Sequence, residues 1–249
     1  MEPNESTPAV QNTPRHAAKQ IEIPPDPELG NWNPLSVLLL VVGLVGFVAL
    51  TVLVFMANKG PLGFDETVLN YMIDHVRSEK VTQIVMYVTD LAMPAALLLV
   101  ALCLTVFAPS PAPVLALVLC ALPGWLLNTL IKRLISRPRP PEELRLAVET
   151  SASFPSSHAV IVMVFYGFIL WLVWHYQRNN PWRIFVAVFM ALFIAAVGLT
   201  RIYLGVHWTS DVLAGFCFGL VWLVLYTRLV APRILAQTPT RNQDEQASF

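Results

Sequence analysis

Three short stretches of the chain combine the residue types that phosphate chemistry requires. They are Lys132-x6-Arg139-Pro140, Pro155-Ser156-Ser157-His158 and Arg201-x5-His207-x3-Asp211. Each stretch lies at the edge of a long apolar segment. Charged groups near a bilayer are costly and seldom incidental. These stretches therefore form the candidate functional site.

The cations among these residues are suited to binding an anion. Lys132, Arg139 and Arg201 stand at the ends of apolar segments and in the adjoining loop. Arginine presents a rigid fork of donors that matches phosphate oxygens, and lysine supplies a point charge. Taken alone, such residues also fit a positively charged membrane flank. We assign Arg133 and Arg137 to that flank, or to a supporting role.

The second stretch precedes an apolar segment, where a helix is expected to begin. Free backbone N–H groups and the helix dipole make such a start an anion site. Ser156 and Ser157 are able to cap the helix, to bind a phosphate oxygen, or to do both. A histidine can titrate near neutral pH, so His158 is a candidate general acid or base.

The third stretch pairs an imidazole with a carboxylate. Asp211, four residues after His207, can accept a hydrogen bond from one ring nitrogen and leave the other free to attack phosphorus. Compensation of a helix N-terminus is the alternative role of Asp211. A metal site built from the two histidines and the carboxylate is disfavoured, because three nearby cations repel a divalent ion. No metal and no cofactor are predicted.

The composition indicates an integral membrane protein. The chain has 249 residues, of which 56% are hydrophobic and 13% are charged, and its mean hydropathy is +0.61. Soluble domains contain about 25% charged residues. The formal net charge is +0, so no global field indicates a nucleic-acid partner.

The apolar blocks predict an all-α bundle of six transmembrane helices over residues 35–230. A hydrocarbon core of about 30 Å requires roughly 20 apolar residues in a helix. The expected spans are Leu35–Ala57, Gln83–Phe107, Val114–Ile131, Ala159–Trp174, Ile184–Leu199 and Val212–Leu229. The polar residues 1–34 and 231–249 are expected to be disordered tails. Between the first two spans, Gly63–Lys80 predicts an amphipathic helix, lying on the membrane interface or packed against the bundle.

Six spans place both termini on one side of the membrane and the three stretches on the other. The stretches can therefore converge on one site. Once Lys132, Arg137, Arg139 and Arg201 are set aside as functional, the remaining Lys and Arg favour the side of the termini. This bias predicts cytoplasmic termini and a site on the extracytoplasmic face.

In order and spacing, the stretches resemble the type 2 phosphatidic acid phosphatase superfamily, which includes vanadium haloperoxidases and glucose-6-phosphatase. Its pattern is Lys-x6-Arg-Pro, Pro-Ser-Gly-His and Ser-Arg-x5-His-x3-Asp, and the resemblance covers roughly residues 35–230. Two positions depart from it: Ser157 replaces Gly and Thr200 replaces Ser. Ser157 keeps its backbone N–H and Thr200 keeps a hydroxyl, so neither departure removes a group that the chemistry needs.

The resemblance implies a division of roles. His207 would form a phosphohistidine, Asp211 would orient it, and His158 would protonate the leaving oxygen and then activate water. The phosphoryl oxygens would be held by five groups: Lys132, Arg139, Ser156, the Ser157 amide and Arg201.

The predicted function is hydrolysis of a lipid phosphate in the bacterial cytoplasmic membrane. Undecaprenyl pyrophosphate is favoured, and phosphatidylglycerophosphate and phosphatidic acid are the other candidates. A phosphotransferase using the same intermediate and a non-catalytic phospholipid-binding protein are alternatives. The expected partners are a lipid phosphate and the bilayer, and the oligomeric state is open. Gly215-x3-Gly219 allows close helix approach, either within the bundle or in a dimer.

Overall fold

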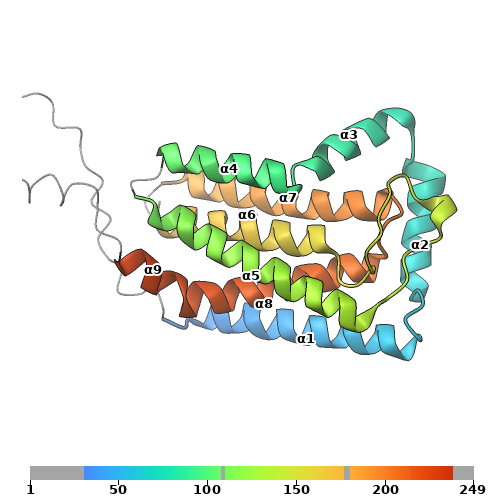
Figure 1. Ribbon diagram of the computed structural model, residues 1–249, viewed down its shortest axis with the longest axis horizontal. Coiled ribbons are helices and arrows are strands. Elements are labelled where there is room, and N and C mark those ends of the chain that lie inside the picture. Colours follow the sequence, from blue (N-terminus) through green and yellow to red (C-terminus); the bar gives the residue numbers. More distant parts are fainter. Residues whose placement is uncertain (1–30, 108–109, 177–179, 238–249) are drawn as a thin grey trace, which may run out of the picture.

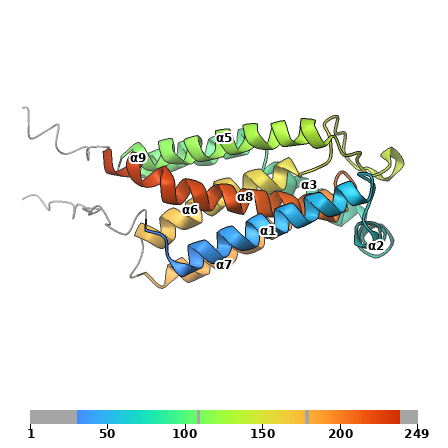
Figure 2. The ribbon, with the colours of Figure 1, turned by 90° about the horizontal axis from the view of Figure 1, so that it is seen from below.

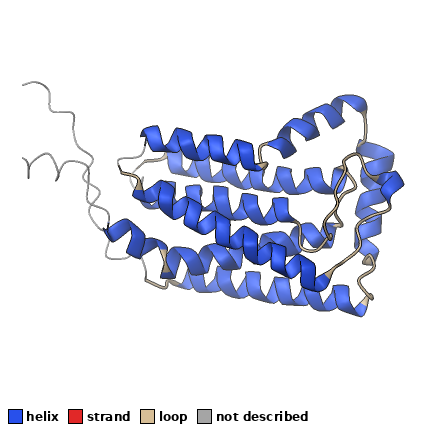
Figure 3. Ribbon diagram, in the orientation of Figure 1, coloured by secondary structure: helices blue, strands red, loops and turns tan. Residues whose placement is uncertain are grey.

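The computed structural model describes residues 31–107, 110–176 and 180–237, which form helices and loops (Figures 1 and 3). The elements in chain order are α1 (Pro34–Met56), α2 (Gly63–Tyr71), η1 (Met72–Val76), α3 (Glu79–Asp90), α4 (Pro94–Phe107), α5 (Ala112–Ile135), η2 (Glu142–Leu144), α6 (Ser157–Tyr176), α7 (Trp182–Tyr203), α8 (Thr209–Leu229) and α9 (Ala231–Gln237).

The predicted bundle of membrane-spanning helices is confirmed. Within the described residues, α1, α5, α6, α7 and α8 are each long and apolar enough to cross a bilayer. The bent pair α3–α4 makes a sixth crossing when it is taken as one span. Most of these helices extend beyond the apolar stretch from which they were predicted, and their extra turns carry polar side chains. The exposed surface of α1 is largely Leu and Val, as a lipid-facing surface requires.

The second span differs from the prediction of one continuous helix. It is divided into α3 and α4, whose axes differ by 55°. Pro94 begins α4, and proline disfavours helical geometry in the residue that precedes it. The bend turns α3 toward the end of the bundle where the polar loops lie (Figure 1).

The segment after α1 lies across that same end of the bundle (Figure 1). α2 packs against the bundle, which is one of its two predicted arrangements. Val68 and Met72 contact a cluster that includes Ile202 of α7 and Val212 of α8. Asp65, in the first turn of α2, is fully buried. A charged residue is therefore carried into the interior from outside the spans.

α6 lies at the centre of the bundle, where it packs against α5, α7 and α8. Two glycines of α8 permit its close contact with α6. A Cβ on Gly215 would lie 2.8 Å from the Ser156 carbonyl oxygen, and one on Gly219 would lie 2.9 Å from the Met163 Cβ. The Gly215-x3-Gly219 pair therefore serves internal packing, and it holds the beginnings of α6 and α8 together.

The expected disordered tail is wrong for Ala231–Gln237, which form α9. Ala231 is fully buried, and Ile234 and Leu235 pack against the main core, so an apolar face holds this short helix on the bundle. At the end of the other predicted tail, Asn33 caps α1 by accepting a hydrogen bond from the Ser36 N–H at 2.8 Å. Residues 1–30 and 238–249, on which the tail prediction otherwise depends, lie outside the described residues.

The start of α1 and the short helix α9 lie at one end of the bundle, and the α5–α6 and α7–α8 connections lie at the other (Figures 1 and 2). The three polar stretches are thus gathered at the end opposite the termini.

Candidate active site

Every residue predicted for the site lies at this end of the bundle, on the last or first turn of a helix or in the loop that follows. Lys132 is in the last turn of α5, Arg201 is in the last turn of α7, and Asp211 is in the first turn of α8. Helix termini converge where antiparallel helices end, so the fold brings the three stretches together.

The carboxylate of Asp211 is fully buried, and three neighbours face one of its oxygens. One oxygen, Oδ2, accepts from the Trp208 N–H at 2.9 Å and from the Ser153 hydroxyl at 2.5 Å, and it lies 3.5 Å from His207 Nδ1. Asp211 therefore caps α8 and also faces the imidazole. The two roles considered from the sequence are compatible in one side chain.

The hydrogen bonds indicate which nitrogen of His207 is free to react. Arg139 Nη1 lies 3.2 Å from Nε2, and a guanidinium can only donate. Nε2 is therefore the acceptor, and the ring proton belongs on Nδ1, facing Asp211 and the Ser153 oxygen. Ser153 was not singled out from the sequence, although it directly precedes the Phe154-Pro155 pair of the second stretch.

Burial holds the pKa of His207 well below its ordinary value, and Arg139, Lys132, Arg201 and His158 lower it further in that order. A buried imidazole loses the solvation that its charged form needs, and neighbouring cations oppose protonation. The ring is therefore neutral at physiological pH, as a nitrogen nucleophile must be.

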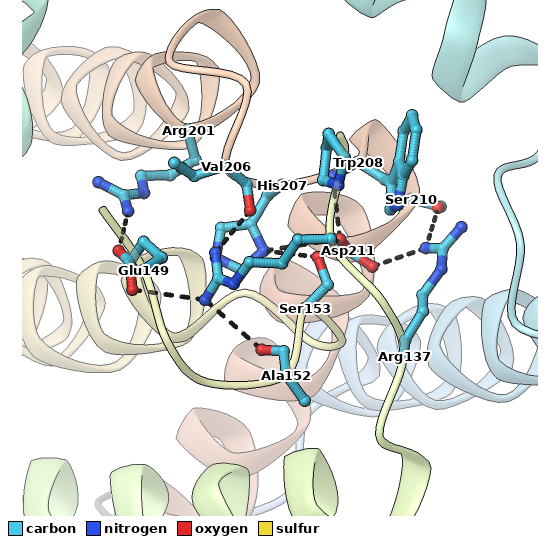
Figure 4. A network of polar contacts seen from close by, with 12 residues as sticks. Arg137, Glu149, Ala152, Ser153, Arg201, Val206, His207, Trp208, Ser210 and Asp211 are labelled. Carbon is cyan, nitrogen blue, oxygen red and sulfur yellow. Dashed lines mark hydrogen bonds and ion pairs between the residues drawn. The ribbon is translucent and has the colours of Figure 1, made fainter. Parts of the chain in front are cut away.

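Of the two roles considered for Arg137, the positively charged flank is wrong, and the supporting role agrees with its contacts. Its side chain is fully buried between the carboxylates of Asp65 and Asp211, and Figure 4 shows its contacts with Asp211 and Ser210. Nη1 donates to Asp211 Oδ1 at 2.6 Å and to the Ser210 hydroxyl at 2.7 Å, and Nη2 donates to Asp65 Oδ2 at 2.9 Å. Asp65 also accepts from the Ser210 N–H at 2.7 Å. A continuous ion-pair network thus links α2 to the carboxylate that faces His207.

On the other side of His207, the cations are held mainly by backbone carbonyls of the α5–α6 and α7–α8 connections. Lys132 Nζ donates to the Ala152 carbonyl at 2.7 Å. Arg139 donates to the Ser151 carbonyl at 2.7 Å and to the Val206 carbonyl at 2.5 Å. Bonds to carbonyls leave the net positive charge of this side available to an anion.

Glu149 connects two of these cations and was not predicted as a site residue. Its carboxylate accepts from Arg201 Nη2 and lies 3.4 Å from Arg139 Nη2 (Figure 4). Arg201 Nη1 donates to the Thr89 hydroxyl of α3 at 2.9 Å. The Glu149 side chain is 25% exposed, unlike the buried carboxylates beside Arg137. Its carboxylate therefore occupies a position between two arginines that a phosphate could take in its place.

Several buried polar atoms among the described residues of this region have no hydrogen-bond partner. Besides Asn128 Oδ1 and Thr209 Oγ1, three of them are Ser156 Oγ, His158 Nε2 and Arg201 Nε. Buried polar groups are nearly always satisfied, so such atoms are expected to meet a ligand or water. The last three belong to residues predicted from the sequence to contact the phosphate or the leaving group.

The two departures from the family pattern have different surroundings. The Ser157 hydroxyl accepts from Asn128 Nδ2 of α5 at 2.9 Å, whereas the Thr200 hydroxyl donates to the Val197 carbonyl of its own helix at 2.6 Å. Ser157 is the first residue of α6, where the initial backbone N–H groups have no partner within the helix. Its predicted contribution through the amide is therefore compatible with its position.

A glycine shapes the turn that presents His207. Gly205 has φ +68, and a Cβ there would lie 2.4 Å from the Leu144 carbonyl oxygen. Both its conformation and its surroundings exclude a side chain. The turn is also tied to the end of η1 and to η2, because Arg77 donates to the carbonyls of Tyr203 and Leu144, each at 2.8 Å.

Comparison with known proteins gives the chain its family. Residues 112–235 match the profile of the PAP2 superfamily. This match places the chain in the PAP2 superfamily. The matched segment contains all eight predicted site residues together with Arg137, but it does not include α2 and Asp65.

The relatives it resembles include several lipid phosphatases. The chain is 38% identical to phosphatidylglycerophosphatase B of Bacillus subtilis over 40% of its own length and 49% of that protein. It is 30% identical to human dolichyldiphosphatase 1 (42% of this chain, 49% of that protein) and 33% identical to lipid A 1-phosphatase of Rhizobium johnstonii (43% of each). The aligned segments thus span about half of these relatives.

The PAP2 fold is also found in a solved structure. A transmembrane PAP2-type phosphatidylglycerolphosphate phosphatase from Bacillus subtilis superimposes with a TM-score of 0.64 at 25% identity, covering 75% of this chain and 93% of that one. The apolar helices and this transmembrane neighbour identify an integral membrane protein.

Proposed function

We propose that this PAP2 protein is a lipid phosphatase that transfers the phosphoryl group to His207 Nε2 and then to water. The observation that carries the proposal is the orientation of the imidazole. Nδ1 faces a buried carboxylate at 3.5 Å, while Nε2 lies 3.2 Å from a guanidinium that is suited to a phosphoryl oxygen.

In the first step, the lone pair of Nε2 attacks phosphorus as the bond to the lipid oxygen breaks. The ring acquires positive charge, which Asp211 stabilises through the proton on Nδ1. His158 donates a proton to the departing oxygen. Its Nε2 atom is buried without a protein partner, as expected for a group that exchanges a proton with the substrate.

In the second step, water replaces the lipid oxygen. The neutral His158 accepts a proton from water as the water oxygen attacks phosphorus, and the P–N bond breaks with its electrons returning to His207. Inorganic phosphate leaves, and both histidines recover their starting protonation states. Throughout, Lys132, Arg139 and Arg201 stabilise the charge on the phosphoryl oxygens, assisted by the Ser156 hydroxyl and the Ser157 amide.

We further propose that the substrate is a polyprenyl diphosphate of the undecaprenyl pyrophosphate type, in a bacterial cytoplasmic membrane with the site on the extracytoplasmic face. Human dolichyldiphosphatase 1, named for a polyprenyl diphosphate, supports this choice. Phosphatidylglycerophosphate and phosphatidic acid are the competing substrates, and the relative from Bacillus subtilis supports the first of these.

Phosphate release by the purified chain in mixed micelles tests this proposal. The panel contains undecaprenyl pyrophosphate, phosphatidylglycerophosphate, phosphatidic acid and lipid A, each with and without EDTA. We expect the highest kcat/KM for undecaprenyl pyrophosphate, full activity in EDTA, and a loss of ~10⁴-fold or more in His207→Ala. Loss of activity in EDTA would contradict the metal-independent chemistry, and no release from any lipid would favour a non-catalytic binding protein.

A lipid acceptor distinguishes hydrolysis from phosphotransfer. Adding a diacylglycerol or a polyprenol to the assay offers a hydroxyl that competes with water for the phosphohistidine. For a hydrolase, the ratio of free phosphate to consumed substrate stays at one. A ratio that falls as the acceptor rises identifies the phosphotransferase alternative.

A further inference from the structure

A large cleft lies at the end of the bundle opposite the proposed active site. Its volume is about 1190 Å³, and its lining comes from α1, α6, α7 and α8. Figure 2, which views the bundle from the side of α1, shows α6, α7 and α8 at this end near the termini. The cleft shares none of the residues assigned to phosphate chemistry.

The lining of the cleft is mainly apolar, and its arginines lie at helix ends on the side of the termini. The apolar part includes Ala191, Ile194, Phe216 and Leu220. Among the described residues that line it, two are arginines, Arg183 and Arg228, and none is acidic. This pattern is complementary to a molecule with a hydrocarbon chain and an anionic head.

The length of the cleft corresponds to one leaflet of a bilayer. Phe216 and Arg228 both line it and belong to α8, where a rise of about 1.5 Å per residue separates them by roughly 18 Å. Half of a hydrocarbon core of about 30 Å is about 15 Å. An acyl chain lying beside Phe216 thus places its headgroup at the level of Arg228.

The two arginines retain capacity for a phosphate group. Arg228 donates from Nη1 to the Asn31 carbonyl at 2.9 Å, but its Nε atom is buried with no partner among the described residues. The Arg183 guanidinium lies 4.5 Å from the Trp174 ring centroid, an arrangement typical of the membrane interface.

We infer that this cleft binds an anionic phospholipid from the leaflet on the side of the termini, with its phosphate at Arg183 and Arg228 and an acyl chain reaching toward Phe216. The bound lipid is distinct from a substrate at His207, because no residue that lines the cleft belongs to the proposed active site. By contacting four helices at once, it stabilises their packing through mass action.

Fluorescence quenching tests this inference, because Trp171 and Trp174 line the cleft. The full chain, purified in detergent, is titrated with phosphatidylglycerol or phosphatidylcholine carrying brominated acyl chains. We expect phosphatidylglycerol to quench the fluorescence at lower concentrations than phosphatidylcholine does. Most of this quenching should be absent from the Trp171→Phe/Trp174→Phe variant. Excess inorganic phosphate should not reverse it, because phosphate has no acyl chain.

Matched variants separate charge recognition from general lipid contact. Arg183→Gln/Arg228→Gln should weaken phosphatidylglycerol binding by about fivefold for each arginine. Arg233→Gln, an exposed arginine of α9 outside the cleft, should leave it unchanged. Ala191→Phe, which fills the cleft, should reduce quenching by both lipids.

Equal quenching of the unaltered chain by the two lipids, or a preference that survives the double substitution, would overturn the inference in favour of non-selective surface lipid. If the double variant does not elute as a monodisperse particle, the single variants and Ala191→Phe decide. Phosphatidylglycerol should then raise the Tm of the unaltered chain more than phosphatidylcholine does, and Ala191→Phe should abolish that difference. Its persistence in Ala191→Phe would equally overturn the inference.

Discussion

The two ring nitrogens of His207 face surroundings of opposite character. On the Nδ1 side, Asp211, Arg137 and Asp65 are fully buried and bonded to one another. On the Nε2 side, the bonds lead to loop carbonyls and to the partly exposed Glu149. We call these the closed side and the open side. The closed side fixes the nucleophile in place, and the open side can exchange its partners for a phosphoryl group.

Among substitutions that disrupt one side of His207, the largest effect is expected from Arg137→Met on the closed side. It leaves two buried carboxylates without their cation, which costs about 3–5 kcal/mol of folding stability. We expect a large fall in Tm in micelles and a loss of kcat in whatever protein remains folded. Arg133→Met, at an exposed position in the last turn of α5, is the control. Equal Tm values for the two variants would contradict the positioning role of Arg137.

Substituting two serines of one loop, one on each side of His207, compares the closed and open sides directly. Ser153→Ala removes a hydrogen bond to a buried carboxylate, worth about 1.5–3 kcal/mol, so we expect kcat to fall roughly 10–100-fold. Ser151→Ala removes only contacts of 3.2 and 3.4 Å to Arg139 and Lys132 on the open side. Its kcat should change less than about threefold. Similar losses in both variants would remove the distinction between the sides.

Gly215→Ala tests the packing that positions the start of α6 against α8. The new methyl group meets Ser156 and Ala159 at 2.8 Å, and overpacking of this kind costs about 1–3 kcal/mol. Both Tm and kcat should fall. Gly63→Ala is the matched control, because a Cβ there meets nothing within 4 Å. A Gly215→Ala variant with unaltered Tm would show that α6 has room to move.

The smallest effect, of opposite sign, is expected for Glu149→Gln. Removing this charge frees Arg139 and Arg201 from a competing anion, so inhibition by inorganic phosphate should strengthen by a few fold. Glu143→Gln, at an exposed position of η2, serves as the control. Weaker inhibition by phosphate in Glu149→Gln would mean that Glu149 chiefly holds the arginines in position.

The sequence was sufficient to locate the predicted site because its residues lie next to apolar spans. Lys132, Arg201 and Asp211 fall in terminal turns of helices that were predicted from hydropathy alone. The count of spans then placed these turns at one end of the bundle. This inference requires no knowledge of side-chain contacts, which explains its success.

Arg137 shows where that approach fails. It lies two residues from Arg139 in the same loop, but it is not one of the motif residues, so the sequence assigns it to a positively charged flank or a supporting role. What separates them is a partner 72 residues away, Asp65, on a helix that no motif includes. A buried ion pair between distant segments leaves no local pattern, whereas an acidic residue in the first turn of a helix is ordinary.

Two other discrepancies had local signals. The bend between α3 and α4 occurs at Pro94, which breaks the predicted span as proline is expected to do. α9 has an apolar face containing Ile234 and Leu235, too short to register as a span but sufficient to pack on the core. In both cases hydropathy averaged over a long segment concealed a feature of single residues.

The central claim is that the closed side prepares His207 for covalent attack on phosphorus. The most direct measurement uses His158→Ala with p-nitrophenyl phosphate, whose leaving group needs no protonation. Nitrophenol should appear in a burst of about one equivalent, because attack proceeds while hydrolysis lacks its base. Mass spectrometry of the quenched protein should then find an acid-labile phosphoryl group on His207. A burst with the phosphoryl group on another residue, or slow turnover with no burst and no labelled protein, would contradict the account.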